Sequence, residues 1–179
     1  MAKRRMRRIV VVPYDPAWPQ MFRAEAKILS PIFGPELIEL HHIGSTAIVG
    51  MHAKPIIDFL PEVRAIEAID ALNGAMIELG YDPRGENGIP GRRYFVKGDD
   101  IVRTHHVHVF QSGHPDVARH VDFCAYLNAH PHAADRYSRL KQQLAAEHPT
   151  SIEDYLAGKT PLIREIDDKA GIWRREADG

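Results

Sequence analysis

The segment HIGSTAIVGMHAKPIIDFL, residues 42–60, sets the centre of the predicted fold. It begins at the end of an alternating run, residues 37–43, which is typical of a strand and leads into the turn Gly44-Ser45. A short apolar run, residues 55–60, predicts the next strand. About nine residues separate the turn from this run, which leaves room for one helical turn and a loop. The segment therefore predicts two strands with a Gly-Ser turn between them.

Outside this segment, strands dominate the first two thirds of the chain and helices the last third. Further strands are predicted over residues 8–13, 93–97 and 102–110, the last two joined by a tight turn. A helix is predicted between Asp15-Pro16 and Gly34-Pro35, and others over residues 65–79, 115–130, 132–147 and 161–174, with a shorter one near 152–156. Residues 81–91 are rich in Gly and Pro and predict an exposed loop. The pattern indicates an α/β (α+β) protein with a helical C-terminal part.

The bulk composition predicts one globular domain, residues 1–179. Apolar residues make up 44% of the chain and charged residues 26%, close to the globular average. No repeat or long linker divides it. The formal net charge of -1 provides no overall field that would recruit nucleic acid or an acidic membrane. One local exception is a basic N-terminal arm, Lys3 to Arg8, which either touches phosphate or stays solvated.

The apolar pattern argues against secretion and membrane insertion. Only four apolar residues, Ile9 to Val12, follow the basic start, too few for a secretory signal. No stretch approaches the roughly 20 apolar residues of a membrane helix. The lone cysteine, Cys124, cannot form an internal disulfide, and its aromatic neighbours in the sequence indicate a packing role. These features predict a cytoplasmic protein.

The turn at Gly44 is the first of three candidate site features. Glycine at a strand end lets the backbone approach a ligand closely. The amides that follow, with the hydroxyls of Ser45 and Thr46, can point at phosphate oxygens. The alternative is a turn that merely caps a short helix.

Asp58 is the second feature, because it lies inside an apolar run. A carboxylate in such a run is costly unless it is paired or bound to a cation. Magnesium prefers oxygen ligands and bridges substrate phosphates, so a strand-borne acid suits phosphoryl chemistry. Lys54, just upstream, can pair with a phosphate or with Asp58 itself. A structural salt bridge is the alternative.

His106 and His108 form the third feature. Side chains alternate along a strand, so these two rings and Phe110 share one face, whereas His105 and Val107 share the other. Two imidazoles with this spacing can hold a metal or flank a phosphate. His114, His120, His130, His132 and His148 fall in predicted helices or loops and are expected at the surface. If neighbouring strands of one sheet carry all three features, they form a single polar site.

Several sequence runs, taken together, resemble the GrpB family. The resemblance starts with VPYDPAW (residues 12–18) and continues through HIGSTA (42–47), KPIID (54–58) and HHVHV (105–109). It extends into the C-terminal part, at Tyr126-Leu127, Lys141 and Tyr155…Lys159, and so covers nearly the whole chain. Members of this family also occur as a domain appended to some dephospho-CoA kinases.

The resemblance implies a nucleotidyltransferase-like fold, a short mixed sheet flanked by helices and opening at a Gly-Ser turn. Enzymes of that kind hold magnesium with two carboxylates that have one residue between them in the sequence, and with a third carboxylate from a later strand. Here Asp58 fills one acidic position, Ile56 and Leu60 stand two residues to either side, and the later strand offers His106 and His108.

Three functions follow from these residues. The first is a nucleotide-dependent transferase, in which Gly44, Ser45 and Thr46 cradle the triphosphate. Lys54 and Arg93 neutralise the charge of the triphosphate, and Asp58 binds the metal. His106 or His108 either completes the coordination of the metal or serves as the base. The second is a module that binds a metal or a phosphorylated small molecule without transfer, its Asp58, His106 and His108 suited to zinc, manganese or nickel rather than magnesium. The third is a partner-binding protein in which the histidines are structural. No motif identifies the acceptor or the oligomeric state.

Overall fold

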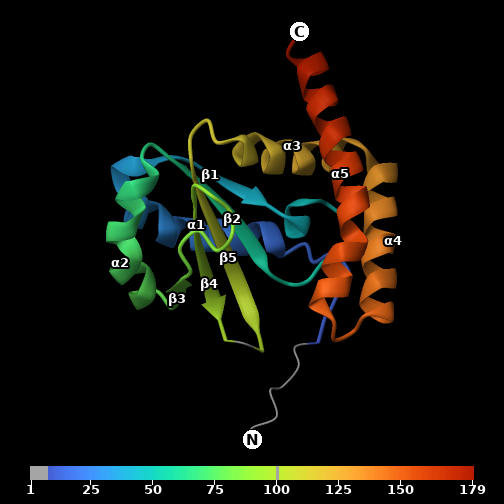
Figure 1. Ribbon diagram of the computed structural model, residues 1–179, viewed down its shortest axis with the longest axis horizontal. Coiled ribbons are helices and arrows are strands. Elements are labelled where there is room, and N and C mark those ends of the chain that lie inside the picture. Colours follow the sequence, from blue (N-terminus) through green and yellow to red (C-terminus); the bar gives the residue numbers. More distant parts are fainter. Residues whose placement is uncertain (1–7, 100) are drawn as a thin grey trace, which may run out of the picture.

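A five-stranded mixed sheet lies at the centre of the protein, which a computed structural model describes over residues 8–99 and 101–179 (Figure 1). The strands are β1 (Leu37–Ile43), β2 (Ile57–Val63), β3 (Tyr81–Pro83), β4 (Arg92–Gly98) and β5 (Arg103–Gln111). Their order across the sheet is β1-β2-β5-β4-β3. The β2–β5 pair is parallel, and the other neighbouring pairs are antiparallel. The short mixed sheet that the family resemblance implies is confirmed.

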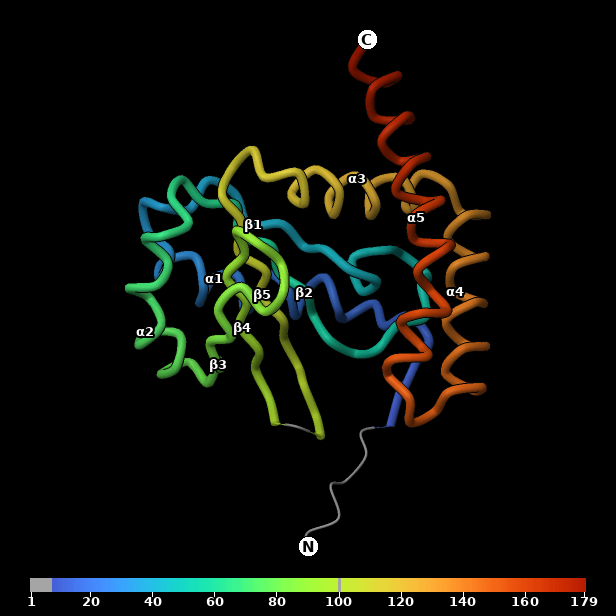
Figure 2. Tube along the Cα trace, viewed as in Figure 1, coloured from blue at the N-terminus to red at the C-terminus, as the bar shows by residue number. Residues whose placement is uncertain are grey.

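Helices cover both faces of this sheet. They are α1 (Trp18–Phe33), α2 (Asn73–Glu78), α3 (Pro115–Ala129), α4 (Pro131–Glu147) and α5 (Ile152–Ala177). Short 3₁₀ helices cover Gly34–Glu36, Ser45–Ala47 and Ile66–Leu72. Figure 2 shows α4 and α5 running side by side, across the molecule from α1 and α2. The helical C-terminal part is therefore confirmed.

Alternation along the central strands divides the core into two layers. On one face, residues such as Phe59 and Val107 pack against α1 and residues 66–76. On the other face, Leu60 and Phe110 pack against α3, α4 and α5. Asp58 shares the parity of Leu60, and His108 that of Phe110, so the polar side chains lie on the face that α3, α4 and α5 cover.

Several predicted boundaries are wrong. The predicted strand over residues 8–13 is a single bridge between Val12 and Ala53, and upstream of it the Ile9 N–H donates to the Pro149 carbonyl instead. The helix predicted over 65–79 divides into a 3₁₀ segment and α2, and the loop predicted over 81–91 contains β3. Lys3, Arg4, Arg5 and Arg7 of the basic arm lie outside the described residues.

Pro161 does not start a helix, as the sequence suggests, but lies inside α5. Proline costs that helix a backbone hydrogen bond, yet tertiary packing keeps it continuous. Tyr155 and Leu162, before and after the proline, are both buried. Between them, Gly158 lets α5 approach α4 so closely that a Cβ added there would lie 2.5 Å from Leu144 Cδ2. None of the described helices combines the length and apolarity needed to cross a bilayer.

Candidate functional site

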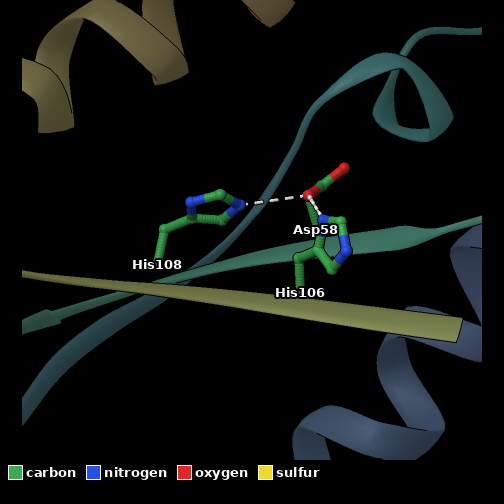
Figure 3. Close-up of side chains that lie close together, drawn as sticks. All are labelled: Asp58, His106 and His108. Atoms are coloured by element: carbon green, nitrogen blue, oxygen red, sulfur yellow. Dashed lines mark hydrogen bonds and ion pairs between the residues drawn. The ribbon is translucent and has the colours of Figure 1, made fainter. Parts of the chain in front are cut away.

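Asp58, His106 and His108 meet on the face of the sheet that α3, α4 and α5 cover (Figure 3). Parallel pairing of β2 with β5 places Asp58 opposite His106, and the strand period of two adds His108 to the same face. The Asp58 Oδ1 atom lies 3.1 Å from His108 Nε2 and 3.4 Å from His106 Nδ1. The predicted convergence of these three residues is therefore observed.

The carboxylate is ionised and partly open to solvent. Burial opposes its charge, but hydrogen bonding and attraction from His106 and His108 outweigh that cost and hold the pKa of Asp58 well below its usual range. The Asp58 side chain keeps 23% of its surface exposed. Its second oxygen, Oδ2, has no donor among the described residues. That oxygen is available to a cation or a ligand.

Arg92 determines the tautomer of His108. The guanidinium Nη1 lies 3.4 Å from His108 Nδ1, and an arginine can only donate, so Nδ1 accepts. In a neutral imidazole the other nitrogen, Nε2, then carries the hydrogen and donates it to Asp58. Arg92 is itself fixed by the carbonyl oxygens of Glu86 and Asn87, at 3.1 and 2.9 Å. In this state His108 orients the carboxylate.

This assignment makes a spectroscopic prediction. In nitrogen-15 NMR of the metal-free protein at pH 7, we expect His108 to show a protonated Nε2 and an unprotonated Nδ1. Arg92→Gln should weaken that preference, because an amide can accept as well as donate. Arg84→Gln is the matched control, since Arg84 pairs with Asp82 on β3. A protonated Nδ1 with a bare Nε2 in the wild-type protein would contradict the assignment.

The Gly44 turn brings backbone against Asp58. Gly44 has φ +74° and ψ -175°, a region open essentially to glycine alone. A Cβ added there would lie 2.6 Å from Asp58 Oδ2, closer than real Cβ atoms come. Two constraints therefore require glycine at position 44: its backbone angles, and the space that the Asp58 carboxylate occupies.

Gly44→Ala should accordingly damage both stability and the site. We expect the free energy of unfolding to fall by about 2 to 4 kcal/mol, from backbone strain plus displacement of Asp58. Gly50→Ala is a matched control, because Gly50 has φ +76° but nothing within 4 Å of its added Cβ. Its cost should be about 1 kcal/mol. Chemical denaturation of both variants measures the difference, and equal costs would show that contact with Asp58 is unimportant.

Ser45 follows this turn and accepts a hydrogen bond from an unexpected residue, Lys141 on α4. The Lys141 Nζ atom lies 2.8 Å from Ser45 Oγ, and Lys141 is only 2% exposed. Lys54 is near as well: its ammonium lies 5.2 Å from the Tyr155 ring centroid, and Lys159 on α5 lies 4.6 Å from the same centroid. Sequence reasoning assigned Lys54 to the site. It named Lys141 and Lys159 only among the residues that carry the family resemblance and did not assign them to the site, because nothing local distinguishes them from surface residues of a helix.

Thr46 and Arg93 were both predicted to bind phosphate, but their side chains make other contacts. Thr46 is 1% exposed, and its hydroxyl lies 3.0 Å from His42 Nε2, so it is turned inward. Arg93 lies on the opposite face of β4 from Arg92, because neighbouring residues of a strand alternate. Its Nε lies 2.6 Å from Asp70 Oδ1. The arginine beside the site is Arg92.

The position of His120 also differs from the prediction. It was expected at the surface, but its ring centroid lies 6.1 Å from that of His108. Burial, with Arg119 and His108 nearby, lowers the pKa of His120 to about 3.

Cys124 is buried as expected, and burial raises the pKa of its thiol to about 12. It packs and is no nucleophile.

The donor set fits a divalent metal. One ligand atom each from Asp58, His106 and His108 can be chosen so that all lie within 4.8 Å of one another. His106 Nε2 is buried without a hydrogen-bond partner among the described residues, which is costly unless something binds there. A carboxylate and two imidazoles suit zinc or manganese, whereas magnesium would use Asp58 and phosphate oxygens.

The fold and this geometry define a mixed α/β protein with a candidate metal- and anion-binding site on one sheet face. Residues 8–169 match the family described as GrpB protein, and the chain belongs to that family. It is similar to the crystal structure of conserved protein GrpB from Enterococcus faecalis, with a TM-score of 0.86, 42% identity, and coverage of 90% of this chain and 96% of that one.

Two relatives are longer than the matched region. The UPF0157 protein YqkA of Bacillus subtilis (strain 168) is 48% identical over 169 residues, which cover 94% of this chain and 49% of that protein. A dephospho-CoA kinase of Mycolicibacterium paratuberculosis (strain ATCC BAA-968 / K-10) is 28% identical over 188 residues, covering 91% of this chain and 46% of the kinase. This chain therefore spans about half the length of either relative.

Proposed function

We propose that this protein binds a nucleoside triphosphate together with a divalent metal and transfers the nucleotidyl group to an acceptor. The observation that supports this most strongly is the meeting of three segments distant in sequence. The Gly44 backbone lies against Asp58 Oδ2, while both imidazoles contact Oδ1. A backbone turn, a carboxylate and two rings are thus within reach of one ligand.

Each residue of the candidate site has a distinct role in such a transfer. Ser45 and the amides after Gly44 bind phosphate oxygens, and Lys54 neutralises their charge. Asp58, with His106 or His108, would hold the metal, which supplies positive charge at the phosphates. The acceptor oxygen forms a bond to the α-phosphorus as the bond to the bridging oxygen breaks, and pyrophosphate leaves. His106 is the candidate base for the acceptor proton, because its Nε2 has no partner among the described residues.

Thermal shift and calorimetry with ATP or GTP test this proposal. With magnesium present we expect a raised thermal midpoint, because a ligand that binds only the folded state stabilises it. Ser45→Ala should weaken binding about tenfold, the loss of one hydrogen bond to a charged group. Ser30→Ala is the control, since its hydroxyl bonds within α1. If no nucleoside triphosphate shifts the midpoint at any magnesium concentration, the proposal fails.

A second candidate is a module of the same fold that binds a metal or a phosphorylated ligand without transfer. It is favoured by the donor set, because Asp58 is the single carboxylate among the grouped ligand atoms of the site. Elemental analysis of protein purified without an affinity tag separates the two. Stoichiometric zinc or manganese, with no pyrophosphate released from bound nucleotide, would support the module and contradict the transferase.

A further inference from the structure

The buried amine of Lys141 has no role in the transfer described above, although it contacts the candidate site directly. Its Nζ atom lies 2.8 Å from Ser45 Oγ, and the residue is 2% exposed. Lys141 lies on α4, whereas Ser45 begins the 3₁₀ helix that follows β1, so the contact joins two elements distant in sequence. A base takes a proton from a nucleophile over a distance of about 2.6 to 3.2 Å. The two side chains therefore have the geometry of a nucleophile and its base.

The surroundings of Lys141 favour its uncharged form. Lys141 is almost fully buried and forms no ion pair with Asp or Glu among the described residues. A buried ammonium without an anion is costly, so such a group gives up its proton. Burial lowers the pKa of Lys141 to about 6, and repulsion from Lys159 and Lys54 adds to the effect. At neutral pH most of the lysine is therefore a free amine, whose lone pair can accept a proton.

Ser45 can supply that proton. Its hydroxyl has one hydrogen and two lone pairs, so the oxygen accepts from the Lys141 amine while its own hydrogen remains free. The same hydrogen can bind a phosphate oxygen before a reaction and pass to the amine during it. Ser45 is half-buried, so a ligand can reach it, whereas Lys141 is closed to solvent. The nucleophile is thus open to a substrate, and its base is shielded from water.

This pair lies beside the place where the proposed ligand would bind. The Gly44 backbone lies against Asp58 Oδ2, and Ser45 is the next residue of the chain. A triphosphate held by the Gly44 turn therefore has its phosphorus atoms near the Ser45 oxygen. Ionisable groups with a strongly shifted pKa cluster at functional sites, and Lys141 is such a group next to a candidate site.

We propose that Ser45 itself accepts the nucleotidyl group, with Lys141 as the base that takes its proton. The Ser45 oxygen forms a bond to the α-phosphorus as the bond from that phosphorus to the bridging oxygen breaks, and pyrophosphate leaves with the electron pair. The hydroxyl proton ends on the Lys141 amine. Lys141 thus does for Ser45 what His106 would do for an external acceptor. This inference rests on the proposed function and names an acceptor that the chain itself carries.

Intact-protein mass spectrometry after incubation of the full chain with magnesium ATP tests the inference. We expect wild-type protein to gain the mass of one nucleotidyl group, and peptide mapping to place that group on Ser45. Ser45→Ala should abolish the adduct, and Lys141→Met should slow its formation at least about a hundredfold, the smaller end of what a positioned base contributes. Ser112→Ala is the control, because Ser112 is an exposed serine whose hydroxyl donates to Glu62. It should leave labelling unchanged.

The pH dependence of labelling gives a second measurement on the wild-type protein, which holds even if Lys141→Met repacks. The base must be uncharged, so at saturating nucleotide the rate should rise about tenfold per pH unit below the Lys141 pKa of about 6 and then level off. Lys54, Lys159 and the phenol of Tyr137 are the groups that face this amine, and the pKa of Lys159, about 8, lies above the inflection. A constant rate between pH 5 and pH 7 would contradict the role of Lys141.

The outcomes separate this inference from the proposed function. If magnesium ATP raises the thermal midpoint but leaves no adduct, or an adduct that persists in Ser45→Ala, the inference is wrong and the function stands. If no nucleotide binds, the function is wrong, and a fluorophosphonate probe, which activated serines attack at phosphorus, decides the role of the pair. Labelling of Ser45 by the probe that depends on Lys141 would then support the pair with another phosphorus substrate, and no labelling would overturn it.

Discussion

Asp58→Asn is expected to weaken binding of magnesium nucleotide at least about a hundredfold, the effect of removing the one charged ligand of a cation site. Asparagine keeps the size of the side chain but removes the charge that the metal requires. Both histidines contact the same oxygen, Oδ1, so the carbonyl oxygen of asparagine can keep these contacts. Its amide nitrogen takes the place of Oδ2, and an amide nitrogen donates and cannot bind a cation.

The measurement is calorimetry of ATP and GTP with magnesium against the wild-type protein and two variants. Asp70→Asn is the control, because it also removes a carboxylate from an ion pair, the one between Asp70 and Arg93. That pair lies on the other face of the sheet. We expect that variant to bind nucleotide as tightly as the wild type. Unchanged affinity in Asp58→Asn would remove Asp58 from the site.

Lys141→Met should make the protein more stable, because Lys141 is almost fully buried and forms no ion pair with a carboxylate among the described residues. Methionine has a similar shape and no charge to desolvate. We expect a gain of about 2 to 4 kcal/mol in the free energy of unfolding at pH 7, hence a thermal midpoint higher by about 5 to 10 °C. Lys27→Met, at an exposed position, should change the midpoint by no more than about 1 °C. A lower midpoint for Lys141→Met would show that the buried ammonium stabilises the fold.

The pH dependence of that gain has a definite sign. The pKa of Lys141 falls from 10.5 to about 6 on folding, so between these values the unfolded chain binds a proton that the folded chain does not. Wild-type stability from this group therefore rises with pH across the window, by up to about 1.4 kcal/mol per pH unit. Neighbouring Lys54 and Lys159 and the phenol of Tyr137 face the same group. The advantage of Lys141→Met should be larger at pH 6 than at pH 9, and denaturation at both values measures it.

The centre of the site could be predicted from the sequence because it lies on strands. A period of two places His106 and His108 on one face, and an acid inside an apolar run marks Asp58. Parallel pairing then needs only the register to bring Asp58 opposite His106. Strand parity and the cost of burying charge are local signals, and both can be read along the chain.

The surrounding residues could not be predicted in the same way. Arg93 rather than Arg92 was assigned to the ligand. Neighbouring residues of a strand point to opposite faces, and the pairing of β4 with β5 sets Arg92 opposite Phe110, on the face of His108. That pairing is a tertiary relation. Lys141 and Lys159 depend on how α4 and α5 pack over the turn, a tertiary relation that no local pattern carries. The continuity of α5 through Pro161 depends on the same packing.

Anomalous scattering from crystals soaked with manganese and a non-hydrolysable triphosphate tests the central claim most directly. The account predicts a manganese peak about 2.2 Å from an Asp58 oxygen, with phosphate oxygens within hydrogen-bond distance of Ser45 and the amides after Gly44. Manganese bound elsewhere, or a triphosphate seated away from the Gly44 turn with Asp58 still held only by its two histidines, would contradict it.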